Sequence, residues 1–218
     1  MTASQVRDAF LVSLDHIEAI QVKLGALIGK GRPLTFPDHY KLAEGLLLSA
    51  WSHWEELLRD LLVYDLATIP TGVLMSEVRR FRTKGAPARL AELIADHPDE
   101  RKFVEWSDFD AVADRADSLI GSTNRFRLVI AALPGGQPLL NKSDLLIVKR
   151  IRNAVAHKSD YAWASFRLLA RKVPFGLTSR QMKGITVGRF LVAHNWGGQR
   201  VLERAIAILR ADARLLVP

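Results

Sequence analysis

Apolar residues recur at intervals of three, four and seven along most of the chain, which is the spacing of one face of an α-helix. From Val6 to Ile28 this pattern predicts a first helix of about 25 residues that ends before residues 29–33. A second long helix is predicted to begin near Asp38. One side of this helix is apolar, at Leu47, Ala50, Trp51, Trp54, Leu58, Leu61 and Leu62. Because both tryptophans stand among leucines, we expect them in the core rather than stacked on bases.

Short breaks divide the middle of the chain, at IPTG, KGAP, HPDE and LPGGQP. Between them the pattern predicts shorter helices at residues 86–96, 108–120 and 123–133. Breaks of a few residues are typical of turns between packed helices rather than of a linker between domains.

Ser143 is predicted to cap the next helix, which carries RIRNAVAHKS at residues 150–159. A basic amphipathic helix at residues 199–217 closes the chain. Alternating strand patterns are scarce. The sequence therefore predicts one all-α domain over residues 1–218, a bundle of long antiparallel helices with shorter helices inserted.

The composition narrows the class of protein. A chain of 218 residues, of which 49% are hydrophobic, can bury a substantial core. It contains no cysteine, which excludes disulfides and thiolate metal or redox sites. The runs LLLSAW and LVIAAL are far shorter than the roughly 18 residues of a membrane-spanning helix, and MTASQVRDAF lacks the apolar region of a secretory signal. We expect a soluble, cytoplasmic protein.

The net charge of +8 is unevenly distributed. Residues 1–117 contain 14 Lys and Arg against 19 Asp and Glu, a net charge of −5, and residues 118–218 contain 17 against 4, a net charge of +13. Such an asymmetry favours a polyanionic partner, with nucleic acid as the first candidate. The alternative is that the two halves neutralise each other within the fold or across a dimer interface.

On a helical wheel, the stretch around RIRNAVAHKS separates into two arcs. Apolar side chains form one arc, at Ile147, Val148, Ile151, Ala154 and Val155. The opposite arc carries three cations, an amide and an imidazole, at Lys149, Arg150, Arg152, Asn153 and His157. We call the opposite arc, together with Lys158 that follows it, the motif face.

The spacing Arg-x4-His is by itself a weak signal. A second instance joins Arg189 to His194 in RFLVAH, and there Phe190 stands where Asn153 stands in the first. Because apolar residues surround that second helix widely, we interpret it as core packing that happens to include a histidine.

RNAVAH resembles the Arg-(polar)-x3-His signature of the HEPN superfamily. The late position of the signature, the early helix with WSHWEELLRD and the basic closing helix resemble the RiboL-PSP type of HEPN protein. Residue by residue, the resemblance covers Arg152, Asn153, His157 and, more loosely, Trp54 and Glu55. Some members carry a tyrosine two residues after the histidine, whereas this chain has Ser159.

The resemblance implies a compact helical bundle and a metal-independent endoribonuclease whose signature lies at the interface of a homodimer. It also implies a setting such as toxin–antitoxin or antiviral defence, where a cognate antitoxin protein restrains the enzyme.

Metal-independent cleavage of RNA requires a base for the 2′-hydroxyl, an acid for the leaving 5′-oxygen, and a group that stabilises the additional negative charge. His157 suits proton transfer because imidazole titrates near neutrality, and a helix C terminus modestly favours its protonated form. Arg152 suits the phosphate, since a guanidinium stays charged throughout. One motif supplies one histidine, so a two-fold homodimer would supply both the acid and the base.

We therefore expect Arg152 and His157 to be catalytic, Glu55 to offset their charge, and a group of substrate-binding residues at Asn153, Lys149, Arg150 and Lys158. We expect no cofactor and no metal, because the other histidines form no HxxH or HExxH pattern and no phosphate-binding glycine loop occurs. Two alternatives stay open. The motif face is the binding surface of a non-catalytic module for RNA, a nucleotide or a protein, or it is an ordinary solvated helix face.

Overall fold

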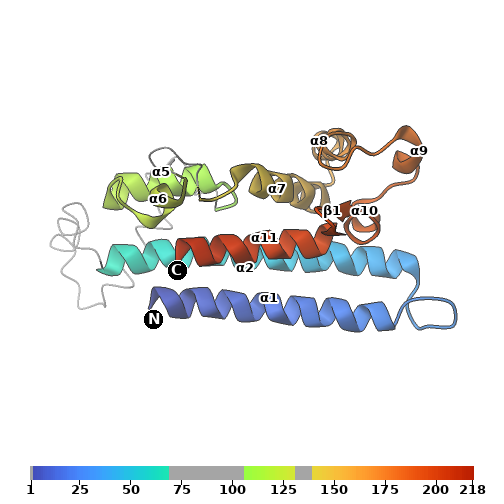
Figure 1. The fold of residues 1–218 in the computed structure, drawn as a ribbon, viewed down its shortest axis with the longest axis horizontal. Helices are drawn as coiled ribbons and strands as arrows, with labels where there is room; N and C mark the ends of the chain where they lie inside the picture. The colour runs from blue at the N-terminus through green and yellow to red at the C-terminus, as the bar shows by residue number, and fades with distance from the viewer. Residues whose placement is uncertain (1, 69–105, 131–138) are drawn as a thin grey trace. The chain divides into compact units, whose positions relative to one another are not determined.

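The computed structural model describes residues 2–68, 106–130 and 139–218, and in these ranges the chain is mostly helical (Figure 1). Two residues each form the antiparallel strands β1 (Asn195–Trp196) and β2 (Gln199–Arg200). The helices are α1 (Ala3–Ala26), α2 (Phe36–Thr68), α5 (Phe109–Ile120), α6 (Arg125–Ile130), α7 (Lys142–His157), α8 (Asp160–Arg171), α9 (Ser179–Met182), α10 (Val187–Ala193) and α11 (Val201–Leu216). The all-α prediction is confirmed at this level, while the predicted helix at residues 86–96 lies outside the described residues.

Helices α1 and α2 are long, antiparallel and packed against each other (Figure 1). The first has 24 residues and the second begins at Phe36, close to the predicted bounds. Thr35 and Asp38 fix the start of α2: the Thr35 N–H donates to Asp38 Oδ2 (2.8 Å), and the Asp38 N–H donates to Thr35 Oγ1 (3.4 Å). This reciprocal pair satisfies two N–H groups that the helix itself leaves without acceptors.

The apolar sides predicted for both helices are buried. Trp51 and Trp54 are each 1% exposed, which confirms their place in the core. The predicted leucines of α2 are buried with them, at Leu47, Leu58, Leu61 and Leu62. On α1 the buried positions are Val6, Phe10, Leu14 and Ile17. Helical periodicity thus identified the buried side of both helices correctly.

Contacts divide the chain into two compact units that share the long helices. The first unit comprises Met1–Phe10, Trp54–Leu140 and Asp212–Pro218, and the second comprises Leu11–His53 and Asn141–Ala211. The expectation of a single domain over residues 1–218 stays a prediction.

In the first unit, aromatic rings connect the long helices to α5 and α6. Trp54 lies 6.0 Å from Phe10 and 6.4 Å from Phe109, measured between ring centroids. Phe109 in turn lies 6.1 Å from Phe126. Such tilted and offset ring pairs contribute beyond their buried area.

In the second unit, α10 approaches the backbone of α2 through Gly188. The Gly188 N–H donates to Glu44 Oε1 (2.9 Å), and a Cβ at this position would collide with the backbone of Tyr40. Phe190 of α10 is fully buried, and its ring meets those of Phe166 (5.2 Å) and Phe175 (4.8 Å) edge-on. Helix α10 therefore lies close to α2 because Gly188 has no side chain. The buried Phe190 ring packs the same helix against other aromatic residues.

Candidate functional site

The motif lies on α7, whose start differs from the prediction. Asn141 caps the helix, because its Oδ1 accepts the N–H groups of Ser143 (3.1 Å) and Asp144 (3.4 Å). The prediction that Ser143 caps α7 is therefore wrong: Ser143 is already inside the first turn. Both residue types cap helices well, and the path of the backbone decides which one does so.

The two arcs of the helical wheel differ in burial as expected. The apolar arc faces the interior of the second unit, where α7 packs against α8 and α10. Its buried members are Val148, Ile151, Ala154 and Val155, joined by Leu145. The motif face is half-buried at Lys149, Arg152 and Asn153, and exposed at Arg150, His157 and Lys158. Helix α7 thus presents its polar side chains away from its own core.

Arg152 and Asn153 are joined directly. Arg152 Nη1 donates to Asn153 Oδ1 over 3.0 Å. This bond orients the guanidinium relative to the helix and leaves the Asn153 amide nitrogen to act as a donor. Asn153, which the sequence predicts as a substrate-binding residue, is therefore also a hydrogen-bond partner of Arg152.

His157 is the last residue of α7, at the negative end of the helix dipole. Lys158 follows with φ of 46°, a left-handed conformation that reverses the chain toward α8. Ser159 then caps α8, accepting the Ala162 N–H through its hydroxyl (3.2 Å). Ser159, which stands where some HEPN proteins carry a tyrosine, therefore has a structural role here. It stabilises the tight turn that follows the exposed His157.

The charges of the basic half are partly neutralised inside the fold. Arg210 binds Asp15 (2.8 Å) and Glu18 (2.7 Å). Arg125 binds Asp65, and Arg127 binds two aspartates of α5. These arginines come from the basic half and their carboxylates from the acidic half, as the second interpretation of the asymmetry requires. In the described residues, Arg150 and Lys158 of the motif face enter no such pair, so positive charge remains on α7.

Glu55, the expected carboxylate, lies half-buried on α2 in the first unit, whereas the motif lies in the second. Its predicted role in offsetting the motif charges stays a prediction.

Leu146 is an exposed apolar residue of α7 that the helical wheel did not include. It is 47% exposed and lies on the same side of α7 as Asn153, seven positions earlier in the sequence. A helical wheel that began at Leu146 rather than at Ile147 would have included this residue.

The second Arg-x4-His match has the environment of a packed histidine. Arg189 is exposed, while Phe190 and Leu191 are buried. The His194 ring lies 5.6 Å from the Phe190 ring. Burial, together with the nearby charges of Arg189 and Arg200, lowers the pKa of His194. Both findings support the interpretation of this match as core packing.

Two arginines of the closing segment, Arg200 and Arg204, make structural contacts. Arg200 Nη1 donates to Ala193 O (3.0 Å) and Asn195 Oδ1 (3.2 Å). The Arg204 guanidinium lies 5.9 Å from the Trp196 ring centroid. The Arg200 bonds join β2 to β1 and to the end of α10, and the Arg204–Trp196 contact joins the hairpin to α11.

Two general features bear on the class of site. Across the described ranges, no three histidine, aspartate or glutamate side chains are grouped as metal ligands would be. In the same ranges, no helix has both the length and the apolar content that crossing a membrane requires.

The arrangement at α7 has the elements of phosphate chemistry: a guanidinium bonded to Asn153, an exposed imidazole at a helix terminus, and the exposed cations Arg150 and Lys158 beside them. In comparisons with known proteins, no family model, no curated protein and no solved structure matches this chain. The likeness to the HEPN superfamily therefore stays a resemblance carried by the residues of the motif.

Proposed function

We propose that the protein is a metal-independent endoribonuclease that acts as a homodimer, with one α7 helix from each copy lining the cleft. The observation that carries the proposal is the difference in burial between the two sides of α7. Its apolar arc is buried within its own unit, while the Arg152–Asn153 pair and the exposed His157 lie on the other side. A second copy of this surface would bring two guanidinium groups and two imidazoles to one RNA strand.

The proposed reaction is a transesterification. The 2′-oxygen attacks the adjacent phosphorus as His157 of one copy accepts the 2′-hydroxyl proton. The bond from phosphorus to the 5′-oxygen then breaks as protonated His157 of the second copy donates a proton to that oxygen. The products are a 2′,3′-cyclic phosphate and a free 5′-hydroxyl. Arg152, oriented by Asn153, stabilises the charge on the non-bridging oxygens.

The exposed cations would bind RNA on either side of the scissile phosphate. Arg150 and Lys158 lie on the solvent side of α7 and carry charge that no described carboxylate neutralises. Binding through such groups releases counterions and weakens steeply with salt. A cleft of this charge is costly without a polyanion, which agrees with the implied setting in which an antitoxin protein occupies it until the enzyme is released.

The proposal predicts that single-stranded RNA is cleaved in EDTA and that His157→Ala abolishes this cleavage. Loss of a general acid–base group lowers rates by about 10²- to 10⁴-fold. The assay follows a labelled RNA on denaturing gels and identifies the cyclic phosphate end by mass spectrometry. His16→Ala removes another exposed histidine, from α1, and should cleave at the rate of the unchanged protein.

Equal cleavage by the unchanged protein and His157→Ala would contradict the proposal. RNA binding without any product would instead support the non-catalytic module. In that case Arg150→Ala should weaken binding and reduce its salt dependence while the strand stays intact. A protein that remains monomeric with RNA present, measured by light scattering, would exclude the shared cleft.

A further inference from the structure

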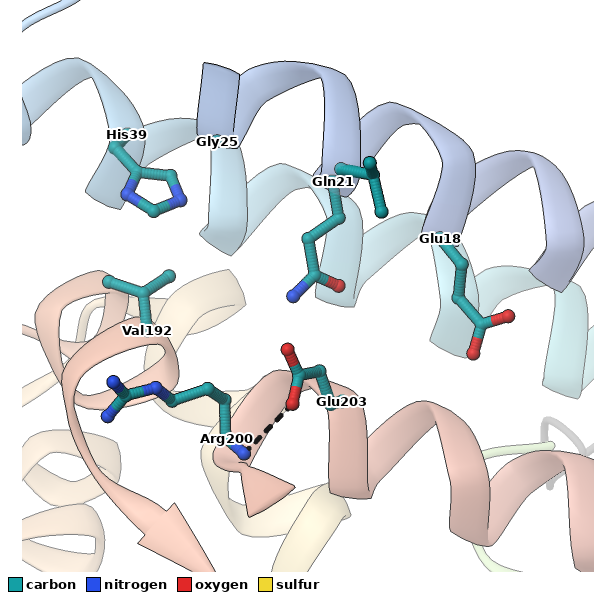
Figure 2. A pocket seen from close by; sticks show the side chains of 8 residues that line it. Glu18, Gln21, Gly25, His39, Val192, Arg200 and Glu203 are labelled. Atoms are coloured by element: carbon teal, nitrogen blue, oxygen red, sulfur yellow. Dashed lines mark hydrogen bonds between the residues drawn. The ribbon is translucent and has the colours of Figure 1, made fainter. Parts of the chain in front are cut away.

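A pocket of about 440 Å³ lies in the second unit, between α1, the start of α2, α10 and the start of α11 (Figure 2). Its lining contains the carboxylates of Glu18 and Glu203 and also the cation Arg200, with the imidazole of His39 beside them. Glu18 forms an ion pair with Arg210 (2.7 Å), and Glu203 Oε2 accepts the N–H of Arg200 (3.1 Å). Because both signs of charge line this pocket, its composition favours neither an anion nor a cation.

The surface that follows the motif in the second unit has charge of one sign. Residues 158–200 contain eight Lys and Arg and a single acidic residue, Asp160, a net charge of +7. All eight cations are exposed, at Lys158, Arg167, Arg171, Lys172, Arg180, Lys183, Arg189 and Arg200. None of them forms an ion pair with another described residue. Asp160 stands in the first turn of α8, where a negative charge complements the helix dipole. Such a surface attracts polyanions.

Helix α8 carries the part of this charge that follows the motif most closely in the sequence. Its inner side is buried at Ala162, Phe166, Leu169 and Ala170. Its outer side, which we call the α8 face, is exposed at Tyr161, Ala164, Arg167, Leu168 and Arg171. Tyr161, Ala164 and Leu168 follow one another at intervals of three and four residues, so they form one row along the helix. Arg167 and Arg171 lie one turn apart beside this row.

Tyr161 is 85% exposed, although an aromatic ring normally gains from burial. Its ring meets no other ring, and its hydroxyl has no hydrogen-bond partner, among the described residues. It stands four residues after His157, across the short turn between α7 and α8, and these two helices pack against each other. An exposed aromatic side chain among cations is the arrangement with which proteins stack on unpaired bases and hold the adjoining phosphates.

A basic surface with exposed apolar side chains also suits an anionic membrane. Leu168 (56% exposed) and Val173 (90% exposed) would then be the inserted residues. Two observations favour RNA. The α8 face has a single large aliphatic residue, whereas a membrane-bound helix buries a whole apolar side. Its most exposed large side chain is an aromatic ring that follows the proposed catalytic His157 by four residues.

We propose that the α8 face binds a single-stranded part of the RNA next to the cleavage site. Tyr161 stacks on an unpaired base, and Arg167 and Arg171 bind the flanking phosphates. This proposal rests on the proposed function for its ligand and adds a requirement for unpaired bases in the substrate. A base within a duplex is already stacked on its neighbours and offers no free face to Tyr161. The two arginines bind the backbone of either form.

The test of the ring uses the full chain and a fluorescently labelled oligoadenylate of 2′-O-methyl RNA, which lacks the attacking 2′-hydroxyl and stays intact. Fluorescence anisotropy measures the affinity. Tyr161→Ala should weaken binding by about 5- to 100-fold, the usual loss of one base–aromatic stack. Tyr161→Phe keeps the ring and should bind like the unchanged protein, whereas Tyr161→Leu should lose as much affinity as Tyr161→Ala. A duplex with oligouridylate should bind all these proteins equally.

The test of the charges uses the double variant Arg167→Ala with Arg171→Ala. It should weaken binding of both the single strand and the duplex. On the single strand, the slope of log K against log salt concentration should fall in magnitude by about 1.4, because each phosphate contact contributes about 0.7. Lys23→Ala with Lys30→Ala removes two exposed cations at and after the end of α1 and should leave the slope unchanged. All substitutions are at exposed positions, so each variant should unfold at the temperature of the unchanged protein.

The proposal is overturned if the oligoadenylate does not bind, if Tyr161→Ala binds it as tightly as the unchanged protein, or if Tyr161→Ala weakens the single strand and the duplex equally. Vesicles of phosphatidylglycerol and phosphatidylcholine test the membrane. Vesicle binding that Leu168→Ala weakens, together with RNA binding that the α8 variants leave unchanged, overturns the proposal in favour of a membrane surface. Cleavage of unmodified RNA is measured separately. Normal cleavage by His157→Ala, with loss of binding in Tyr161→Ala, would contradict the ribonuclease mechanism while supporting the α8 face.

Discussion

At the scale of single residues, the structure depends on positions where no other side chain would fit. Gly188 is the clearest case, because its Cα lies against the backbone of Tyr40 and its N–H binds the buried carboxylate of Glu44. A backbone neighbour cannot rotate away as a side chain can. The crossing of α10 and α2 therefore requires glycine for its lack of a side chain, whatever its helix propensity.

Gly188→Ala should lower the free energy of unfolding by about 1–3 kcal/mol or more, the usual cost of overpacking a close contact. Gly45→Ala is the matched control, since Gly45 lies within α2 with nothing within 4 Å of the added methyl group. It should raise stability by about 0.5–1 kcal/mol through helix propensity. Urea denaturation measures both, and a stable Gly188→Ala variant would contradict the described crossing.

At the scale of elements, the ends of helices are fixed by single side chains. Asn141 starts α7, Ser159 starts α8, and Thr178 forms a reciprocal cap with Gln181 at α9. The turn between α7 and α8 is only two residues long, so the caps on both sides determine where His157 stands. The residues that follow His157 in the sequence therefore help to set its position at the end of α7.

Asn141→Ala should destabilise the protein by about 1 kcal/mol, because two N–H groups of α7 lose their acceptor. Ser143→Ala tests the position that the sequence favoured, and it should change stability by less than about 0.5 kcal/mol, as exposed substitutions do. Thermal denaturation of both variants separates the two caps. The reverse order of effects would restore Ser143 as the cap.

At the scale of the whole molecule, distant segments are joined by buried charges. In the first unit, Arg125 of α6 binds Asp65 of α2 through two hydrogen bonds of 2.6 and 2.7 Å. Its third contact is to Leu216 O at the end of α11 (3.1 Å). One guanidinium therefore connects three helices, and Asp65 is only 3% exposed. Removing Arg125 would leave the buried Asp65 carboxylate without compensation.

Arg125→Met should lower the free energy of unfolding by about 3–5 kcal/mol, since the Asp65 carboxylate stays buried without its partner. The double variant Arg125→Met with Asp65→Leu should regain a large part of that loss, because no charge is then left in the interior. Asp8→Asn breaks the exposed pair with Arg7 and should cost less than about 1 kcal/mol. Chemical denaturation would contradict the interpretation if the double variant were the least stable.

The candidate site was predictable from the sequence to the extent that it is local. Arg152, Asn153 and His157 lie on one helix, and helical geometry alone places them on its polar side. The Arg152–Asn153 hydrogen bond was not predictable, because side-chain rotamers depend on the surrounding packing. The pocket lined by Glu18, His39 and Glu203 was not predictable either, because these residues are far apart along the chain and are brought together only by folding.

By itself, the sequence determined the helical class, the buried sides of α1 and α2, and the two arcs of α7, because each follows from the periodic burial of apolar side chains along a helix. The tertiary structure decided which carboxylates meet which arginines, as in the pair of Arg210 with Glu18. It also decided that Asn141 rather than Ser143 begins α7. The ion pairs depend on how segments that are remote in sequence pack together, and the cap depends on the path of the backbone before α7. The pattern of apolar and polar residues records neither.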